Sequence, residues 1–222
     1  AQLREIGRSF ARSVKIPADL AQELARVTSV AQGVWAKARA ADKVADFAPT
    51  LARVIELRRQ EATCLAEGGD LYDALLNDYE PEATAASIGA MFDRMRPRLV
   101  ALREAVLGAD TPKGLQGSFG KDGQLALARK AATAFGYDWT RGRIDLAVHP
   151  FSSGGGNDSR ITTRVVESDP FNCLYSTIHE VGHSSYELNI DPAYGMTPLG
   201  HGVSMGVHES QSRIYENQIG RS

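Results

Sequence analysis

Two histidines and a glutamate stand in the spacing His-Glu-x-x-His, at His179, Glu180 and His183. If this stretch is an α-helix, four residues turn the chain through roughly 400°, so the two imidazoles lie one above the other on a single face. From there both can reach one zinc ion at about 2.0–2.1 Å. Glu180 follows the first histidine directly, where it can act as general base on a zinc-bound water without being a ligand. The pattern predicts metal-assisted hydrolysis of peptide bonds.

The residues before this motif are typical of a buried helix, because apolar side chains recur at helical spacing at Phe171, Leu174, Tyr175 and Ile178. Two histidines on one face of a buried helix need polar partners, and a single metal ion satisfies both. The alternative is a surface helix that carries two histidines and no metal.

A catalytic zinc site takes a third protein ligand and keeps one position open. The candidates later in the chain are Glu187, His201, His208 and Glu209. Glu187 lies far along the helix axis from His179, which makes joint coordination awkward. Residues 202–211 are expected to begin a second helix, and a helix that carries a carboxylate across the first gives the His₂Glu ligand set. On such a helix His208 points about 100° away from Glu209, which favours a supporting or packing position over metal binding.

Four ordered motifs make the sequence resemble the M32 metallocarboxypeptidases, the carboxypeptidase Taq family. They are His149-Pro150-Phe151, the Asp-x-Arg-x-Thr stretch 158–162, the zinc motif 179–183, and His208-Glu209-Ser210-Gln211. The resemblance implies that His179, His183 and Glu209 bind zinc, with Co²⁺ as another possible metal, and that Glu180 is the base. It further implies removal of single residues from peptide C-termini, a homodimer in the intact enzyme and a cytoplasmic location.

The chain departs from this family in length and in two later motifs. Members of the family are more than twice as long, and neither Ile/Val-Arg-x-x-Ala-Asp nor Gly-x-x-Gln-Asp-x-His-Trp occurs here. We therefore expect a central fragment of such an enzyme. Groups that bind the substrate carboxylate or stabilise the transition state are then expected outside it.

The composition is that of an ordinary globular protein. The 222 residues are 43% hydrophobic and 23% charged, with a formal net charge of −2. This charge gives no sign of a nucleic-acid partner, and the absence of a long apolar run argues against a membrane span. The two cysteines, Cys64 and Cys173, match no zinc-ligand spacing, so we expect them to be free thiols.

The elements that position the motif are expected to be mainly helical. Apolar periodicity predicts helices over residues 1–13, from 17 onward, and over 48–67, 72–79, 83–107 and 125–135. Residues 143–148 and 160–166 instead have the alternating or β-branched pattern of strands. The fold class is therefore mainly α with a small β-hairpin before the His-Glu-x-x-His helix, and the resemblance implies a groove-type helical zinc peptidase. On that resemblance we expect residues 1–140 to wall the groove and residues 141–222 to hold the zinc site, as parts of one truncated domain.

Substrate contacts are expected from the hairpin region. An exposed strand edge can pair with an extended peptide through backbone hydrogen bonds. His149 is a candidate for contact with the substrate, with a hydrogen-bonded structural position as the alternative. Arg160 is a candidate for binding an acidic substrate terminus, since guanidinium pairs bidentately with carboxylate, and an ion pair with Asp158 is its alternative.

Two other functions fit the same residues. A zinc endopeptidase or oligopeptidase of similar helical fold would share the metal site and differ in where it cuts a peptide. An inactive fragment would keep zinc as a structural ion or bind none. Replacement of Glu180 by glutamine separates an enzyme from a structural site.

Overall fold

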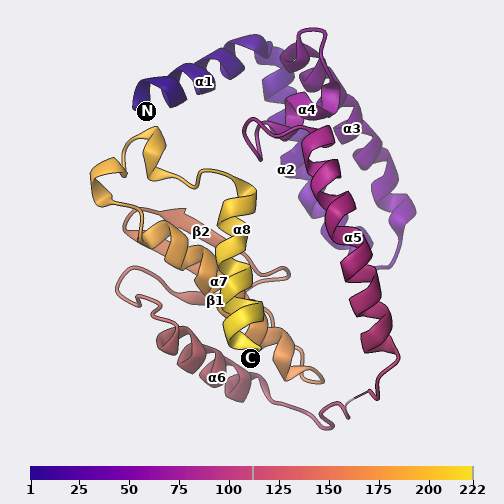
Figure 1. Cartoon of the computed structure of the whole chain (residues 1–222), viewed down its shortest axis with the longest axis vertical. Coiled ribbons are helices and arrows are strands. Elements are labelled where there is room, and N and C mark those ends of the chain that lie inside the picture. The colour runs from indigo at the N-terminus through magenta and orange to yellow at the C-terminus, as the bar shows by residue number, and fades with distance from the viewer. Residues whose placement is uncertain (112, 222) are drawn as a thin grey trace. The chain divides into compact units, whose positions relative to one another are not determined.

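The computed structural model describes residues 1–111 and 113–221, which form two compact units. One unit comprises residues 3–96 and the other residues 97–222 together with the first two residues. Figure 1 labels the elements of both units. Each unit is described separately below.

The unit of residues 3–96 is helical. It contains α1 (Gln2–Lys15), α2 (Ala18–Ala40), α3 (Val44–Ala66), α4 (Leu71–Leu76) and the first part of α5 (Ala85–Leu107). The core forms where Leu20, Leu24 and Val27 of α2 pack against Leu57 of α3. Leu20, Leu24 and Val27 recur at helical spacing along α2, so burial of this apolar stripe explains why the segment folds as a helix.

The second unit places a small sheet and two further helices around α7 (Pro170–Leu188), the helix that carries the His-Glu-x-x-His motif. The surrounding elements are α6 (Lys121–Ala134), β1 (Ile144–Leu146), β2 (Ser152–Gly155), β3 (Asp158–Thr163), the short 3₁₀ turns 192–194 and 198–200, α8 (Met205–Arg213) and a π-helical turn, Ile214–Gly220. The core of this unit joins α6, the sheet and α7 through Ala132, Tyr137, Ile144, Ile161 and Val181.

The sheet differs from the expected hairpin in one respect. Residues 144–146 and 158–163 are strands, but they pair in parallel, and the antiparallel hairpin is formed by β2 and β3. The strand order is β1-β3-β2. The segment between the two predicted strands contains β2, because Gly156-Asn157 forms a two-residue turn, with a φ of 62° at Gly156 that suits glycine. The predicted fold class, mainly helical with a small hairpin before the motif helix, is confirmed.

Hydroxyl groups fix α7 against the sheet. Thr177 donates from Oγ1 to the carbonyl oxygen of Cys173 at 2.8 Å, and its Oγ1 lies 3.1 Å from Oγ1 of Thr163 on β3. All three residues are fully buried. Because buried hydroxyls must be paired, these contacts set the rotation of α7 and thereby the direction in which its histidines point.

A glycine lets α8 approach α7 closely. A Cβ atom added at Gly182 would lie 2.6 Å from Cα of Ser212, so only glycine permits this contact. Ser204 caps α8, where its Oγ accepts a hydrogen bond from the backbone N–H of Val207 at 3.1 Å. The second helix predicted from residues 202–211 is therefore present and crosses the motif helix. Among the described residues, no helix combines the length and apolar character that a membrane span requires.

Candidate metal centre

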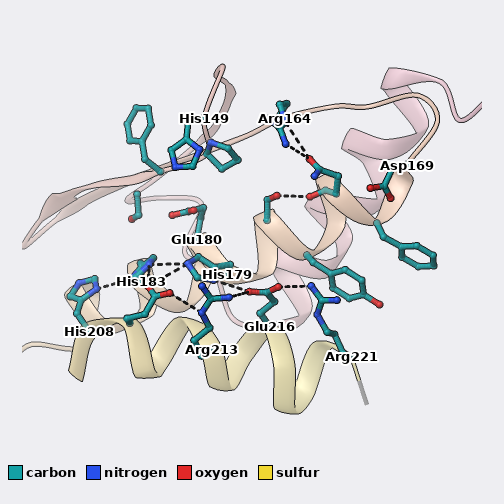
Figure 2. Close-up of a pocket in the computed structure, with 18 residues that line it drawn as sticks. His149, Arg164, Asp169, His179, Glu180, His183, His208, Arg213, Glu216 and Arg221 are labelled. Carbon is teal, nitrogen blue, oxygen red and sulfur yellow. Dashed lines mark hydrogen bonds and ion pairs between the residues drawn. The ribbon is translucent and has the colours of Figure 1, made fainter. Parts of the chain in front are cut away.

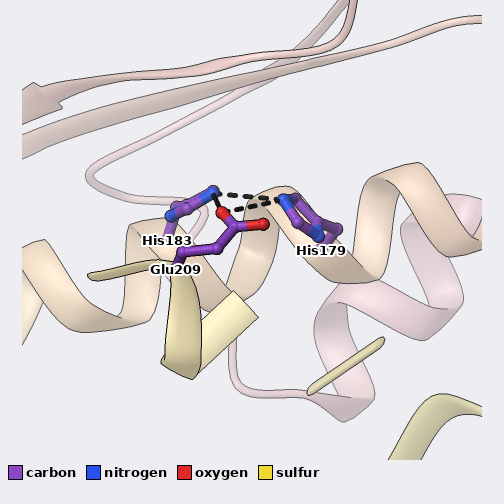
Figure 3. A group of neighbouring side chains, drawn as sticks. All are labelled: His179, His183 and Glu209. Carbon is purple, nitrogen blue, oxygen red and sulfur yellow. Dashed lines mark hydrogen bonds and ion pairs between the residues drawn. The ribbon is translucent and has the colours of Figure 1, made fainter. Parts of the chain in front are cut away.

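Three side chains from α7 and α8 converge with ligand atoms facing one another, as Figure 3 shows. Nε2 of His179 and Nε2 of His183 are 3.2 Å apart. Oε2 of Glu209 lies 3.5 Å from the first nitrogen and 3.1 Å from the second. Atoms that share one tetrahedral zinc ion at about 2.0–2.1 Å lie roughly 3.3–3.4 Å from one another. The donor set and its separations therefore fit a single divalent metal ion.

His179 is held from behind by a buried carboxylate. Its Nδ1 lies 3.0 Å from Oε2 of Glu216, in the π-helical turn after α8. Glu216 also accepts hydrogen bonds from Arg213 at 3.2 Å and from Arg221 at 2.6 Å. Burial acts to raise the pKa of Glu216, but the bonds from Arg221 and His179 outweigh it and keep the pKa below its usual value. An ionised Glu216 accepts the Nδ1 proton of His179 and leaves Nε2 free for a metal.

His183 has a different partner on its far side. Its Nδ1 lies 2.6 Å from Nδ1 of His208, and Nε2 of His208 lies 2.7 Å from Oε1 of Glu187. Burial, followed by the charges of His179 and His208, lowers the pKa of His183 to about 4. His183 is therefore neutral at physiological pH, which is the form that binds metals.

Glu180 is buried and lies outside the cluster of three ligand atoms. Figure 2 places it in the cavity, on the side of His149. Burial, with smaller effects from the charges of Glu209 and Glu216, raises its pKa to about 7. A carboxyl group with this proton affinity can both accept and release a proton near neutral pH.

The ligand atoms open into a cavity of about 940 Å³. Figure 2 shows it bounded on one side by the segment that carries His149 and Arg164, and on the other by α8 and the turn that follows it. Its lining includes His149, Pro150, Phe151, Ser152, Arg164, Asp169, Phe171, Asn172, Tyr175, Ser176, Arg213 and Arg221 besides the groups of the centre. This volume suits a small molecule or a few residues of a peptide.

The residues predicted from the sequence divide into two groups. His179, Glu180, His183 and Glu209 come together, and His149 lines the cavity beside them. Arg160 does not line the cavity; it forms an ion pair with Asp158 at 2.8 Å, the structural alternative considered for it. Among the other third-ligand candidates, His201 is exposed, and His208 and Glu187 bond to each other behind His183.

Sequence reasoning missed the arginines of the cavity and Glu216. One signal was available for Glu216, because it follows Glu209 by seven residues, a spacing that on a helix returns to within about 20° of the same face. Arg213 ends α8 and Arg221 follows the π-helical turn, and both bond to that carboxylate. Arg164 occupies the cavity position expected for Arg160 and lies 3.4 Å from Oδ1 of Asn172.

Comparisons with known proteins agree along the whole chain. The family model described as carboxypeptidase Taq (M32) metallopeptidase matches residues 1–222. Thermostable carboxypeptidase 1 of Thermus thermophilus is 40% identical over 99% of this chain and 46% of its own length.

Solved structures give the same result. The M32 carboxypeptidase from Deinococcus radiodurans is 41% identical with a TM-score of 0.88, over 100% of this chain and 45% of that one. Metallocarboxypeptidase 1 of Trypanosoma cruzi is 33% identical with a TM-score of 0.83, over 100% of this chain and 46% of that one. The chain thus spans a little under half the length of these relatives.

Proposed function

This chain belongs to the carboxypeptidase Taq (M32) family of metallopeptidases, and from this premise we propose that it carries the metal centre and general base of a zinc-dependent carboxypeptidase. The observation that carries the proposal is the triangle of His179, His183 and Glu209 ligand atoms, with the buried Glu180 beside it. M32 metallopeptidases bind a divalent metal. The His₂Glu donor set favours zinc, and Co²⁺ accepts the same nitrogen and oxygen ligands.

The metal, when bound by these three residues, supplies Lewis acidity to the scissile carbonyl and to water. Glu180 takes a proton from the attacking water and passes it to the leaving amine, so that one proton moves and the carboxylate is restored. Its raised pKa of about 7 supports both transfers. Glu216 and Arg213 hold the side chains of the ligands in place through the contacts with His179 and Glu209.

The substrates proposed are peptides that lose single residues from the C-terminus. The cavity beside the centre and the edge of β2, which contributes Ser152 to its lining, support an extended peptide in this position. His149 is proposed to contact that peptide. Arg160 is proposed only as a charge that attracts an acidic terminus from outside the cavity, because its guanidinium forms an ion pair with Asp158.

The proposal is tested by mass spectrometry of a mixed peptide set incubated with the zinc-loaded chain. Wild type is compared with Glu180→Gln and with Glu167→Gln, a matched change at an exposed glutamate outside the cavity. We expect stepwise loss from C-termini with wild type and Glu167→Gln. Glu180→Gln should retain zinc and lose on the order of 10²–10⁴ in rate, the usual contribution of a general base.

The alternatives give other results. Internal cuts would favour an endopeptidase or oligopeptidase of the same family of folds. Zinc binding without any cleavage would favour an inactive metal-binding fragment. A cytoplasmic location, a homodimer of the intact enzyme and a division into residues 1–140 as the wall of a groove and residues 141–222 as the zinc-site region remain predictions.

A further inference from the structure

His208 and Glu187 have no role in the chemistry above. Both are metal-ligand types, and neither belongs to the ligand cluster of the described residues. Each nevertheless lies within hydrogen-bond distance of a partner in one chain of contacts, from His183 to His208 to Glu187. Because this series of contacts ends on a metal ligand, the nitrogen that carries the proton in each histidine affects metal binding.

Packing holds this chain of contacts in one geometry. The rings of His208 and His183 are inclined by only 26° with centroids 4.7 Å apart, which suits two rings joined edge to edge through their Nδ1 atoms, and the ring of Tyr186 lies 4.7 Å from that of His208. A Cβ atom added at Gly202 would lie 2.9 Å from Cδ2 of His208. The ring therefore has close neighbours at His183, at Tyr186 and at Gly202.

Only one arrangement of protons satisfies every contact. A metal at Nε2 of His183 requires the lone pair there, so the ring proton sits on Nδ1 and is donated to Nδ1 of His208. A neutral His208 that accepts at Nδ1 carries its own proton on Nε2 and donates it to the Glu187 carboxylate. In the reverse arrangement, the lone pair of His208 Nε2 would face the carboxylate oxygen at 2.7 Å, which is repulsive. Glu187 thus selects, through His208, the ring nitrogen of His183 that carries the proton.

We propose that Glu187 and His208 form a positioning relay, which fixes His183 in the tautomer whose Nε2 is free to bind the metal. The inference rests on the proposed metal site and deepens it. The two histidine ligands are then held differently, His179 by a direct carboxylate and His183 by a carboxylate acting through a second imidazole. Glu187 does not line the cavity, and His208 is proposed to act through its contact with His183.

Zinc affinity, measured by competition with a chromophoric chelator, tests the relay without using catalysis. His208→Phe keeps the ring and removes both nitrogens, and it should weaken zinc binding 10- to 100-fold, the usual effect of losing a group that orients a ligand. His201→Phe, the same change at an exposed histidine outside the cavity, should bind zinc as wild type does.

A conservative variant separates a relay from simple packing. Asparagine at position 208 places its Oδ1 near the site of Nδ1 and can still accept from His183. The relay therefore predicts that His208→Asn binds zinc more tightly than His208→Phe. Packing alone predicts the opposite order, since phenylalanine fills the space better. Glu187→Leu should also weaken binding, because the carboxylate that selects the tautomer is gone.

Gly202→Ala perturbs the relay while every polar group stays in place. The added methyl group must displace the His208 ring, so zinc binding should fall several-fold. Gly114→Ala, which meets nothing within 4 Å, is the matched control. Circular dichroism of each variant verifies that it is folded.

The outcomes distinguish this inference from the function on which it rests. Wild-type zinc binding combined with equal affinities for His208→Phe and His201→Phe would overturn the relay and leave the metal site intact. An affinity of His208→Asn below that of His208→Phe would also overturn it. A wild-type chain that takes up no zinc would overturn both proposals.

Discussion

Removal of the Glu216 carboxylate should weaken metal binding, although Glu216 is not itself a ligand. Its Oε2 lies 3.0 Å from Nδ1 of His179, and its residue exposure is only 8%. In Glu216→Ala the Nδ1–H of His179 loses its acceptor in a place that water reaches poorly. The imidazole can then rotate or change tautomer, and both changes move the lone pair of Nε2 away from the metal position.

The magnitude follows from the exposure of the three partners. Arg213 and Arg221 have side chains that are 56% and 49% exposed, so water replaces their lost contacts at little cost. The side chain of His179 is only 16% exposed, so the loss of its hydrogen bond to the Glu216 carboxylate determines most of the change in zinc affinity. Hydrogen bonds to charged groups contribute about 1.5–3 kcal/mol, and a tenfold change in affinity corresponds to about 1.4 kcal/mol. We therefore expect zinc affinity to fall roughly 10- to 100-fold.

The assay is a zinc competition titration, with the thermal melt of each variant recorded beside it. Glu216→Gln retains an amide oxygen that can accept from His179, so its loss should be smaller than that of Glu216→Ala. Glu167→Ala, at an exposed position outside the cavity, is the control. A folded Glu216→Ala variant that binds zinc within twofold of wild type would refute the reasoning.

Two further predictions concern stability. Gly182→Ala places a methyl group against the backbone of α8, so overpacking should lower the free energy of unfolding by about 1–3 kcal/mol, lower Tm by roughly 2–4 °C per kcal/mol and reduce zinc affinity. The control is Gly123→Ala in α6, where the added methyl group meets open space and should be neutral or stabilising. Equal melting temperatures for the two variants would count against close packing of α7 and α8. Hydrogen bonds from Thr140 and Arg141 lower the pKa of Asp138 to about 2. Because the unfolded pKa is about 3.9, this carboxylate stabilises the fold above about pH 4 and loses that effect as pH falls toward 2; Asp138→Asn should flatten the decline of Tm over that interval, and an unchanged decline would contradict the assignment.

The local pattern of the sequence determined the helices and the main chemistry. Helical periodicity predicted the start of α2 and the bounds of α3 and α6 to within four residues, and it predicted that the motif lies on a helix, because a stripe of apolar residues has one stable solution, burial against another element. The spacing of His179 and His183 on one helix face is likewise a local property of four residues. Glu180 follows from the same local rule, and the resemblance added Glu209 as the third ligand.

Only the tertiary structure decided which side chains meet across elements. The parallel pairing of β1 with β3 depends on the chain between them, which turns back as β2. Arg160 and Arg164 have the same chemistry in sequence, but Arg160 has a carboxylate within reach at Asp158, and Arg164 faces the cavity. Glu187 and His208 are separated by twenty-one residues and are joined at 2.7 Å.

The physical reason for this division is range. Helix periodicity and ligand spacing act over a few residues, within one rigid element whose geometry is known in advance. The contacts of Glu216, His208 and Glu187 depend on how closely α8 crosses α7, which is set by the absence of a side chain at Gly182. The sequence by itself determined the metal-binding helix, and the packing of the second helix decided how its histidines are held.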